Sequence, residues 1–270
     1  MFLFINWNID PEIFAIGPVS IRWYGLLFAS GFLFGQRIMA HIFKVENVKE
    51  SLLDSLLLTM VVSTVLGARI GHFAFYEPSV FMNDPLQVIR PPFAGLASHG
   101  ALIGILLALF VYARTQKMHF FWLTDRMVIV AALGGFFIRL GNLMNSEIVG
   151  KVTDVPWGFL FLRNTEFLPV YPRHPAQLYE SLSCLVLFGV LYYLWNRFRG
   201  QLPQGILLGI FIIWVFGLRF LFEYLKENQE AFEAGLPFNM GQILSVPAVL
   251  LGIGIMIYAK SNKNRAIWYT

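Results

Sequence analysis

Seven long apolar segments constrain the fold of this chain more than any other feature. Each comes near the roughly 20 residues that a helix needs to cross a bilayer. They cover residues 21–43, 52–75, 96–112, 120–140, 176–195, 205–225 and 243–259. Only 13% of the 270 residues are charged, whereas a soluble domain carries about 25%. The sequence therefore predicts an all-α polytopic membrane protein with seven transmembrane helices. We expect one transmembrane domain over residues 1–270.

Lysine and arginine in the loops predict the orientation, because their excess marks the cytoplasmic side of a membrane protein. One set of alternate loops, with the C-terminal tail, carries Lys44, Lys49, Arg114, Lys117, Arg197, Arg199, Lys260, Lys263 and Arg265. The opposite loops are longer, and acidic residues dilute their basic ones. The N-terminus is thus expected outside and the C-terminus in the cytoplasm. The net charge of +4 is modest, so we read the basic residues as topology signals and lipid contacts and expect no nucleic-acid partner.

A polar cluster directly follows the fourth apolar segment. Arg139, Asn142 and Asn145 are spaced three apart and share one face if the helix continues. Glu147 and Gly150 follow at once. Ionisable groups at the edge of a bilayer are costly, so they indicate a functional site by default. The alternative is that Arg139 only extends to the membrane interface and complements a helix C-terminus.

Polar residues of the other segments are expected at the same membrane level, once the predicted orientation is applied. They are Tyr24, Arg69, His99, His174, Gln177, Tyr179, Glu180, Arg219, Glu223, Gln242 and Ser245. Three arginines at one level predict an anion site, and guanidinium matches the geometry of phosphate. Glu147, Glu180 and Glu223 are candidates to orient them. Arg219 and Glu223 are four apart and can pair along a helix, which leaves open a purely structural ion pair.

The remaining signals are weaker. The loop over residues 142–175 predicts a small β-rich cap, since Trp157-Gly-Phe-Leu-Phe-Leu alternates as a strand does; its aromatic residues fit interface anchors equally well. Asp125 and Arg126 fit a helix cap and a topology charge. No metal-ligand spacing, phosphate-binding glycine loop or nucleophile turn is present. We therefore expect no metal.

Spacing alone leaves two classes of function open: an enzyme acting on an anionic headgroup at the outer leaflet, and a secondary transporter of a lipid or anionic solute. A transporter predicts polar sites near the midplane and often paired repeats. Here the polar groups are expected at one edge, and no repeat is visible. A membrane protease would need a metal or serine motif that the sequence lacks.

The cluster also carries a family resemblance. Gly-Gly-x-x-Ile-Arg-x-Gly-Asn-x-x-Asn-x-Glu-Ile-x-Gly, over residues 134–150, resembles the signature of the bacterial prolipoprotein diacylglyceryl transferases. Ile-Arg-Trp-Tyr-Gly, Gly-Ala-Arg-Ile-Gly, Ser-His-Gly-Ala-Leu-Ile-Gly, His-Pro-Ala-Gln-Leu-Tyr-Glu, Arg-Phe-x-x-Glu and Met-Gly-Gln-x-Leu-Ser-x-Pro also match. The resemblance covers about residues 10–259. Two departures are Ser98-His99-Gly100-Ala101, where members often have Phe-His-Gly-Gly, and Lys151, where an arginine is common.

The resemblance implies a bacterial inner-membrane enzyme with seven spans and a periplasmic active site. It implies transfer of the diacylglyceryl group of phosphatidylglycerol to the lipobox cysteine of a preprolipoprotein, with no cofactor. The family's essential residues correspond to Tyr24, His99, Arg139, Asn142, Glu147, Gly150, Arg219 and Glu223. Arg139 and Arg219 are expected to clamp the lipid phosphate, with Asn142 and Arg69 assisting. Asn145, Glu147, Gly150 and Glu223 complete the expected lipid site. His99 is the candidate base and Tyr24 its rival.

Overall fold

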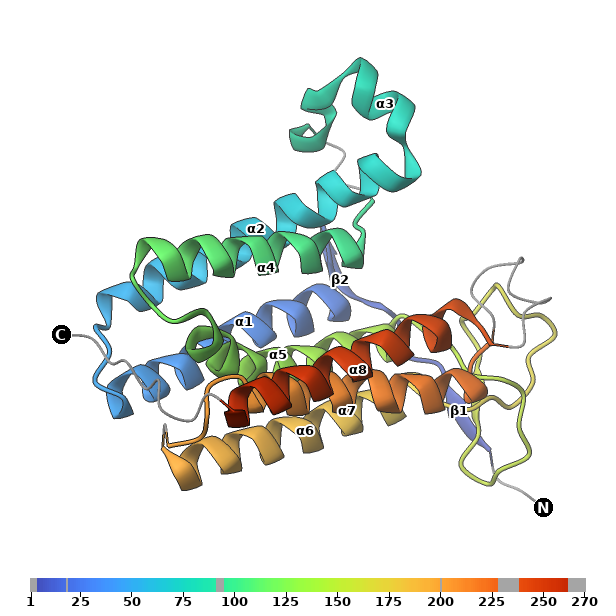
Figure 1. Ribbon diagram of the computed structural model, residues 1–270. Helices are drawn as coiled ribbons and strands as arrows, with labels where there is room; N and C mark the ends of the chain where they lie inside the picture. Colours follow the sequence, from blue (N-terminus) through green and yellow to red (C-terminus); the bar gives the residue numbers. More distant parts are fainter. Residues whose placement is uncertain (1–3, 18, 91–94, 200, 228–237, 262–270) are drawn as a thin grey trace. The chain divides into compact units, whose positions relative to one another are not determined.

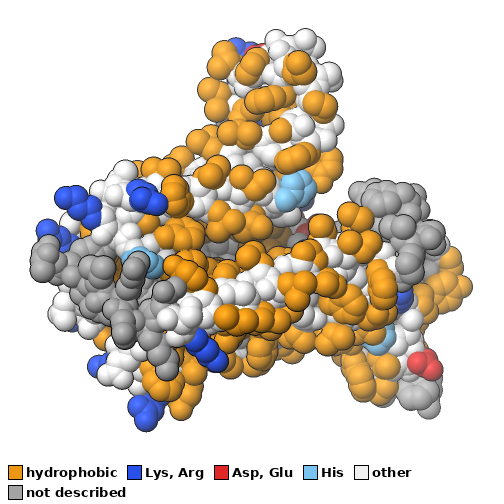
Figure 2. Space-filling model, in the orientation of Figure 1, with side chains coloured by type: hydrophobic (Ala, Val, Ile, Leu, Met, Phe, Trp, Pro, Cys, Tyr) orange, Lys and Arg blue, Asp and Glu red, His pale blue; other side chains and the backbone are white. Residues whose placement is uncertain are grey.

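The computed structural model describes residues 4–17, 19–90, 95–199, 201–227 and 238–261. Within them, seven helices are long and apolar enough to cross a membrane (Figure 1). They are α1 (Trp23–Val45), α2 (Ser51–Tyr76), α4 (Ser98–Thr115), α5 (Phe120–Met144), α6 (Ala176–Phe198), α7 (Ile206–Phe222) continued by the short η2 (Glu223–Leu225), and α8 (Met240–Ser261). Figure 2 shows hydrophobic side chains over much of the visible helix surface. The predicted all-α polytopic membrane fold is confirmed.

The chain divides into two compact units, each described by itself. The first unit comprises Met1–Ile38 with Asp125–Ala266, and the second comprises Met39–Thr124 with Ile267–Thr270. The boundaries fall inside α1 and α5, because those two helices run from one unit into the other. The prediction of one transmembrane domain over residues 1–270 stays a prediction.

Small residues allow close packing of helices in the first unit, where α6, α7 and α8 lie side by side (Figure 1). A Cβ added to Gly209 of α7 would lie 3.0 Å from the Gly252 carbonyl oxygen of α8. The carboxylate of Asp125 accepts hydrogen bonds from the backbone nitrogens of Gly205 (2.7 Å) and Leu208 (2.8 Å). Asp125 thus caps the N-terminus of α7, where free N–H groups favour an anion.

Four glycines set the packing of α2 against α4 in the second unit. Gly67 and Gly71 of α2 face Gly100 and Gly104 of α4, each pair spaced four apart. A Cβ added to Gly104 would lie 2.6 Å from the Ser63 carbonyl oxygen and 3.0 Å from Gly67 Cα. Small residues at this spacing let two membrane helices approach backbone to backbone.

Short elements outside the spans were mostly not predicted. In the first unit, β1 (Ile5–Trp7) pairs in parallel with β4 (Phe159–Phe161), and β2 (Glu12–Ile16) pairs antiparallel with β3 (Val19–Arg22). In the second unit, α3 (Pro78–Asn83) and the 3-10 helix η1 (Pro85–Ile89) follow α2. Only β4 matches a strand that the alternation around Trp157 predicted.

The segment that contains β4 packs on a small core of its own. Leu143, Val149, Phe159 and Phe161 are buried together. The indole nitrogen of Trp7, from β1, donates to the Leu143 carbonyl oxygen at 3.0 Å. This core ties the segment to the end of α5. That residues 142–175 form a cap on the periplasmic side stays a prediction.

Candidate functional site

Arg139 lies near the C-terminal end of α5, and neighbouring side chains fix its guanidinium. Its Nε is 2.6 Å from Glu180 Oε2 on α6, and its Nη1 donates to Asn142 Oδ1 at 3.3 Å. The Glu180 side chain is 9% exposed and that of Arg139 is 29% exposed. Within the described part of the chain, Nη2 of Arg139 has no partner. Nε and Nη1 of the arginine therefore have partners in the protein, and Nη2 remains as a donor for a ligand.

Glu147 receives the two amides of the cluster. Its Oε1 accepts from Asn142 Nδ2 at 2.7 Å and from Asn145 Nδ2 at 3.3 Å. Its backbone oxygen accepts from Gln177 Nε2 of α6 at 2.5 Å. Since α5 ends at Met144, Asn145 belongs to the turn that follows the helix. Asn142 joins the two ends of this chain of contacts, because it bonds both Arg139 and Glu147.

Gly150 is required by close backbone contacts. Its nitrogen donates to the His174 carbonyl oxygen at 3.0 Å, and the next nitrogen, of Lys151, donates to the Leu225 carbonyl oxygen at 2.8 Å. A Cβ added to Gly150 would lie 2.6 Å from His174 Cβ and 2.8 Å from the Leu225 oxygen. A side chain there would push η2 and the segment before α6 apart. The described contacts give Gly150 this packing role.

Arg219 and Glu223 lie at the end of α7, where the sequence predicted their pairing. Arg219 Nε is 3.6 Å from Glu223 Oε1. The Glu223 side chain is 4% exposed, whereas that of Arg219 is 42% exposed. Glu223 Oε2 also accepts from Asn239 Nδ2 at 3.0 Å, just before α8. The buried carboxylate thus holds an arginine whose terminal nitrogens lack a partner among the described residues.

Lys226 joins the two arginine sites, and sequence reasoning missed it. Its Nζ is 2.5 Å from Glu180 Oε1 and 3.4 Å from Glu223 Oε1, and its side chain is only 3% exposed. Each carboxylate therefore meets two cations, which lowers the cost of burying it. The three-residue spacing to Glu223 was a visible signal. The contact with Glu180 was not, because it depends on how α6 and η2 pack.

We call this connected set the ion-pair chain. It runs from Glu147 through Asn142, Arg139, Glu180, Lys226 and Glu223 to Arg219. Its three cations are matched by three carboxylates, so the site is electrically balanced without a ligand. Within the first unit, its members lie where α5 and α7 end and α6 begins. An arginine at each of two points leaves guanidinium nitrogens available, an arrangement suited to a phosphate group.

Tyr24 belongs to the same unit. It is the second residue of α1 and is half-buried. A Cβ added to Gly141 of α5 would lie 2.8 Å from its ring, so that glycine makes room for the tyrosine. The charges of Glu147 and Arg139 act on its hydroxyl. Tyr24 therefore lies within electrostatic range of the ion-pair chain.

His174 lies just before α6, beside Tyr179, Trp157 and Asp154. Its Nδ1 is 3.2 Å from the Tyr179 hydroxyl oxygen, which also accepts from the Trp157 indole nitrogen at 2.9 Å. Burial lowers the pKa of His174 below its usual value, and the nearby charge of Asp154 opposes this effect. The neutral form of His174 is therefore favoured.

Arg69 and His99 belong to the second unit. Arg69 is buried, and its Nε, Nη2 and Nη1 donate to the carbonyl oxygens of Val88 (3.1 Å), Gln87 (3.1 Å) and Gly95 (3.3 Å). Its nitrogens thus hold the connection between α2 and α4. His99 is exposed in the first turn of α4, and its ring centroid lies 5.2 Å from that of Phe75.

Comparison with known proteins identifies the family. The family model described as prolipoprotein diacylglyceryl transferase matches residues 11–258. A phosphatidylglycerol–prolipoprotein diacylglyceryl transferase of Tolumonas auensis is 44% identical over 96% of this chain and 99% of its own length. Relatives of the same name from Chloroherpeton thalassium and Bacteroides fragilis are 42% and 38% identical, over 93% and 98% of this chain and 92% and 98% of their own lengths. This chain belongs to the prolipoprotein diacylglyceryl transferase family.

Proposed function

We propose that this protein transfers the diacylglyceryl group of phosphatidylglycerol to the lipobox cysteine of a preprolipoprotein. The observation that carries the proposal is the match over nearly the whole chain with relatives whose names give phosphatidylglycerol and prolipoprotein. The ion-pair chain supports it, because it presents two anchored arginines at the ends of apolar helices. These relatives favour the transferase over a transporter.

The phosphate of phosphatidylglycerol is held by Arg139 and Arg219 in this proposal. Glu180 and Glu223 lie beside the Nε atoms of the two arginines, and Asn142 accepts from Nη1 of Arg139. Nη2 of Arg139 and the terminal nitrogens of Arg219 remain as donors for the phosphate. Asn142 supports Arg139, and Asn145 and Glu147 support Asn142. Donors fixed before the reaction stabilise charge that develops in the transition state. Arg69 was expected to help bind the phosphate, and its contacts with backbone carbonyl oxygens do not support that role.

The transfer replaces a carbon–oxygen bond with a carbon–sulfur bond. The thiolate of the lipobox cysteine attacks the glyceryl carbon that bears the phosphate ester, and glycerol phosphate leaves with the electron pair of the broken bond. The thiol proton goes to a base, for which we propose His99, since a neutral imidazole nitrogen can accept a proton. Tyr24 is the rival for handling this proton. The arginines balance the charge gathering on the leaving group.

We further propose a location in the bacterial inner membrane, with the N-terminus in the periplasm and the C-terminus in the cytoplasm. The excess of lysine and arginine in alternate loops supports this orientation. The ion-pair chain then lies toward the periplasm, where lipobox peptides emerge. A cysteine placed at residue 163, on an exposed part of the segment before α6, should react with an impermeant thiol reagent from the periplasmic side. Labelling only from the cytoplasmic side would show that the orientation is opposite to the one proposed.

The direct test uses the purified full-length protein, phosphatidylglycerol vesicles and a synthetic lipobox peptide, read by mass spectrometry. We expect a peptide mass increased by one diacylglyceryl group, together with release of glycerol phosphate. A matched peptide with serine in place of the lipobox cysteine should stay unmodified. If the cysteine peptide stays unmodified while the protein moves phosphatidylglycerol between leaflets, the transporter is the better assignment.

A further inference from the structure

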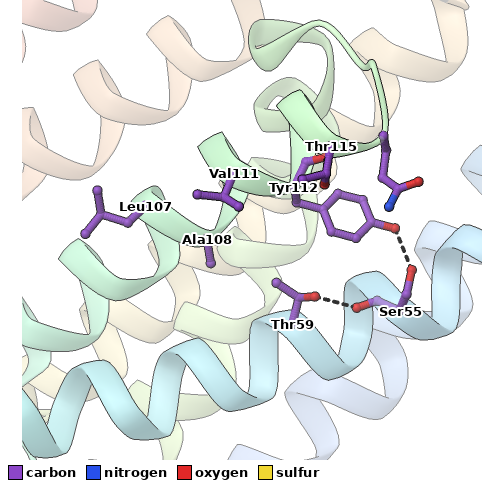
Figure 3. Close-up of a pocket in the computed structure, with 8 residues that line it drawn as sticks. Ser55, Thr59, Leu107, Ala108, Val111, Tyr112 and Thr115 are labelled. Atoms are coloured by element: carbon purple, nitrogen blue, oxygen red, sulfur yellow. Dashed lines mark hydrogen bonds between the residues drawn. The ribbon is translucent and has the colours of Figure 1, made fainter.

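A groove in the second unit lies at the opposite end of α4 from His99 and has no part in the proposed reaction. It has a volume of about 510 Å³, within the 300–1,000 Å³ typical of ligand pockets. Its apolar wall is formed by Leu107, Ala108 and Val111, on the C-terminal half of α4 (Figure 3). Its polar end is formed by Ser55, Thr59, Tyr112, Thr115 and Gln116. We call it the hydroxyl groove.

The wall of the hydroxyl groove is apolar and exposed within the second unit. Leu107 is 62% exposed and Val111 is 58% exposed, although both lie on a membrane-spanning helix. Apolar side chains of this kind on a membrane-spanning helix are suited to pack against an acyl chain. The groove becomes polar only toward the last turn of α4 and the first turns of α2, where α4 ends and α2 begins. Its polarity therefore changes along the helices as that of a lipid changes from acyl chain to headgroup.

The hydroxyl protons at the polar end are already used inside the protein. The Tyr112 and Ser55 hydroxyls lie 2.6 Å and 3.0 Å from the Leu52 carbonyl oxygen and within hydrogen-bond distance of each other, so their two protons are used among these three oxygens. Thr59 donates to the Ser55 carbonyl oxygen at 2.6 Å, and Thr115 donates to that of Tyr112 at 3.1 Å. Figure 3 shows Tyr112 reaching from α4 toward Ser55 on α2, with their oxygens 2.7 Å apart.

This bonding leaves the groove rich in acceptors. A hydroxyl has one proton and two lone pairs, so each of these oxygens can still accept but has no proton for a ligand. Gln116 alone adds side-chain N–H donors. A headgroup suited to this end must therefore donate hydrogen bonds. A primary ammonium supplies three N–H donors in a compact group, whereas a trimethylated ammonium supplies none.

The surrounding charges suit the rest of such a headgroup. Arg114 and Lys117 lie at the same end of α4 and are exposed. The Arg114 guanidinium is 5.0 Å from the centre of the Phe110 ring. Basic residues at a membrane boundary favour lipid phosphates. Neither cation lines the groove, but both belong to the end of α4 at which the groove is polar. An ammonium on the hydroxyl oxygens and a phosphate near this helix end together describe a zwitterionic phospholipid.

We propose that the hydroxyl groove binds a phosphatidylethanolamine-type lipid, whose ammonium donates to the oxygens of Ser55, Thr59 and Thr115 while an acyl chain lies along Leu107 and Val111. This site is separate from the proposed catalytic one. It stands or falls independently of the transferase activity, since none of its residues belongs to the ion-pair chain.

The test compares lipids that differ only in headgroup methylation. The purified full-length protein is first delipidated. It is then mixed with one of four lipids that have identical acyl chains: phosphatidylethanolamine, its mono- or dimethyl form, or phosphatidylcholine. Native mass spectrometry measures the fraction of protein that retains the lipid. We expect retention to fall stepwise with each methyl group, by roughly fivefold over the series, as expected for lost hydrogen bonds. Equal retention of phosphatidylcholine and phosphatidylethanolamine would overturn the proposal; phosphatidylglycerol is left out of the series, because the proposed catalytic site would retain it.

Variants locate the lipid. Replacing both Ser55→Ala and Thr115→Val removes two acceptors, while Tyr112 keeps its bond to Leu52. Phosphatidylethanolamine retention should fall by roughly three- to tenfold, with phosphatidylcholine retention unchanged. Ser30→Ala is the control, because Ser30 makes the same kind of backbone bond, to the Leu26 carbonyl oxygen at 2.8 Å, on another helix. A well-folded double variant, judged by its melting temperature, with an unchanged lipid preference would refute this placement.

Discussion

The two units hold their helices together by different physical means. In the second unit, α2 and α4 approach backbone to backbone at four glycines. In the first unit, the end of α7 is joined to α5 and α6 by the ion-pair chain, which buries Glu223 and Lys226 almost completely. Glycine contacts stabilise by close packing. Buried ion pairs contribute little net stability, but removing one partner is costly. Burying them is therefore expected where the charges are needed for function.

The largest loss of stability should follow Lys226→Met. This change leaves Glu180 and Glu223 buried with one cation fewer each. Breaking a buried pair in this way costs about 3–5 kcal/mol of unfolding free energy, measurable as a lower melting temperature in detergent. Lys151→Met is the matched control, because Lys151 is exposed. Adding Glu223→Gln to Lys226→Met should recover part of the lost stability. Equal melting temperatures of Lys226→Met and Lys151→Met would show that the ion pairs of Lys226 do not stabilise the fold.

Arg139→Ala should have the largest effect on activity. It removes a donor that we propose binds the lipid phosphate, and losing one such group commonly lowers the rate by about 10²–10³. Arg139→Lys keeps the positive charge but loses the planar guanidinium, which can bind a phosphate through two N–H groups at once. Its transfer rate should therefore lie between those of the wild type and Arg139→Ala. The readout is diacylglyceryl transfer to the peptide. Arg163→Ala serves as control, since Arg163 forms an exposed ion pair with Asp10 at 2.9 Å; near-normal transfer by Arg139→Ala would refute the phosphate grip.

Gly104→Leu tests the glycine contact between α2 and α4 in the second unit. The new side chain would meet the backbone of Ser63 and Gly67, and overpacking of this kind costs about 1–3 kcal/mol. Hydrogen exchange should then rise in α2 and α4 specifically. Gly254→Leu is the control, because nothing lies within 4 Å of a Cβ added there. If both variants melt alike, the glycine contact between α2 and α4 does not hold these helices.

The smallest effect concerns His174 and pH. Burial lowers its pKa in the folded state, so the unfolded chain binds the proton more readily. The stability that His174 contributes is therefore present above its unfolded pKa, about 6.5, and is lost as pH falls below that value. Between pH 7 and 5, the melting temperature of the wild type should fall slightly more than that of His174→Gln. A larger fall in the melting temperature of His174→Gln than in that of the wild type would show that folding does not lower the pKa of His174.

His99→Gln distinguishes the two candidates for the thiol proton. If His99 is the base, transfer should drop and lose its rise with pH near neutrality. Tyr24→Phe is the companion variant, since it removes only a hydroxyl. Unchanged pH profiles of transfer for His99→Gln would remove His99 from this role and leave Tyr24.

Neighbouring residues show how far sequence reasoning reached into the site. Arg139 and Asn142 were predicted to share a helix face, and Arg219 was predicted to pair with Glu223, because helical periodicity fixes which residues lie together. The structure shows a contact within each of these two sets. Glu180 was predicted to orient an arginine, and it contacts Arg139. Lys226 was read only as a topology signal. Asp125 was read as a helix cap, yet it caps α7 rather than its own helix.

The sequence by itself determined the seven spans and the polar ends of the helices, since a bilayer demands long apolar runs and penalises charge within them. Only the tertiary structure decided that Lys226 lies between Glu180 and Glu223, that Arg69 donates to backbone carbonyls, and that a groove opens beside Tyr112. Periodicity gives the face of a helix on which a side chain lies. The partner that meets it depends on the packing of distant segments, which no local pattern encodes.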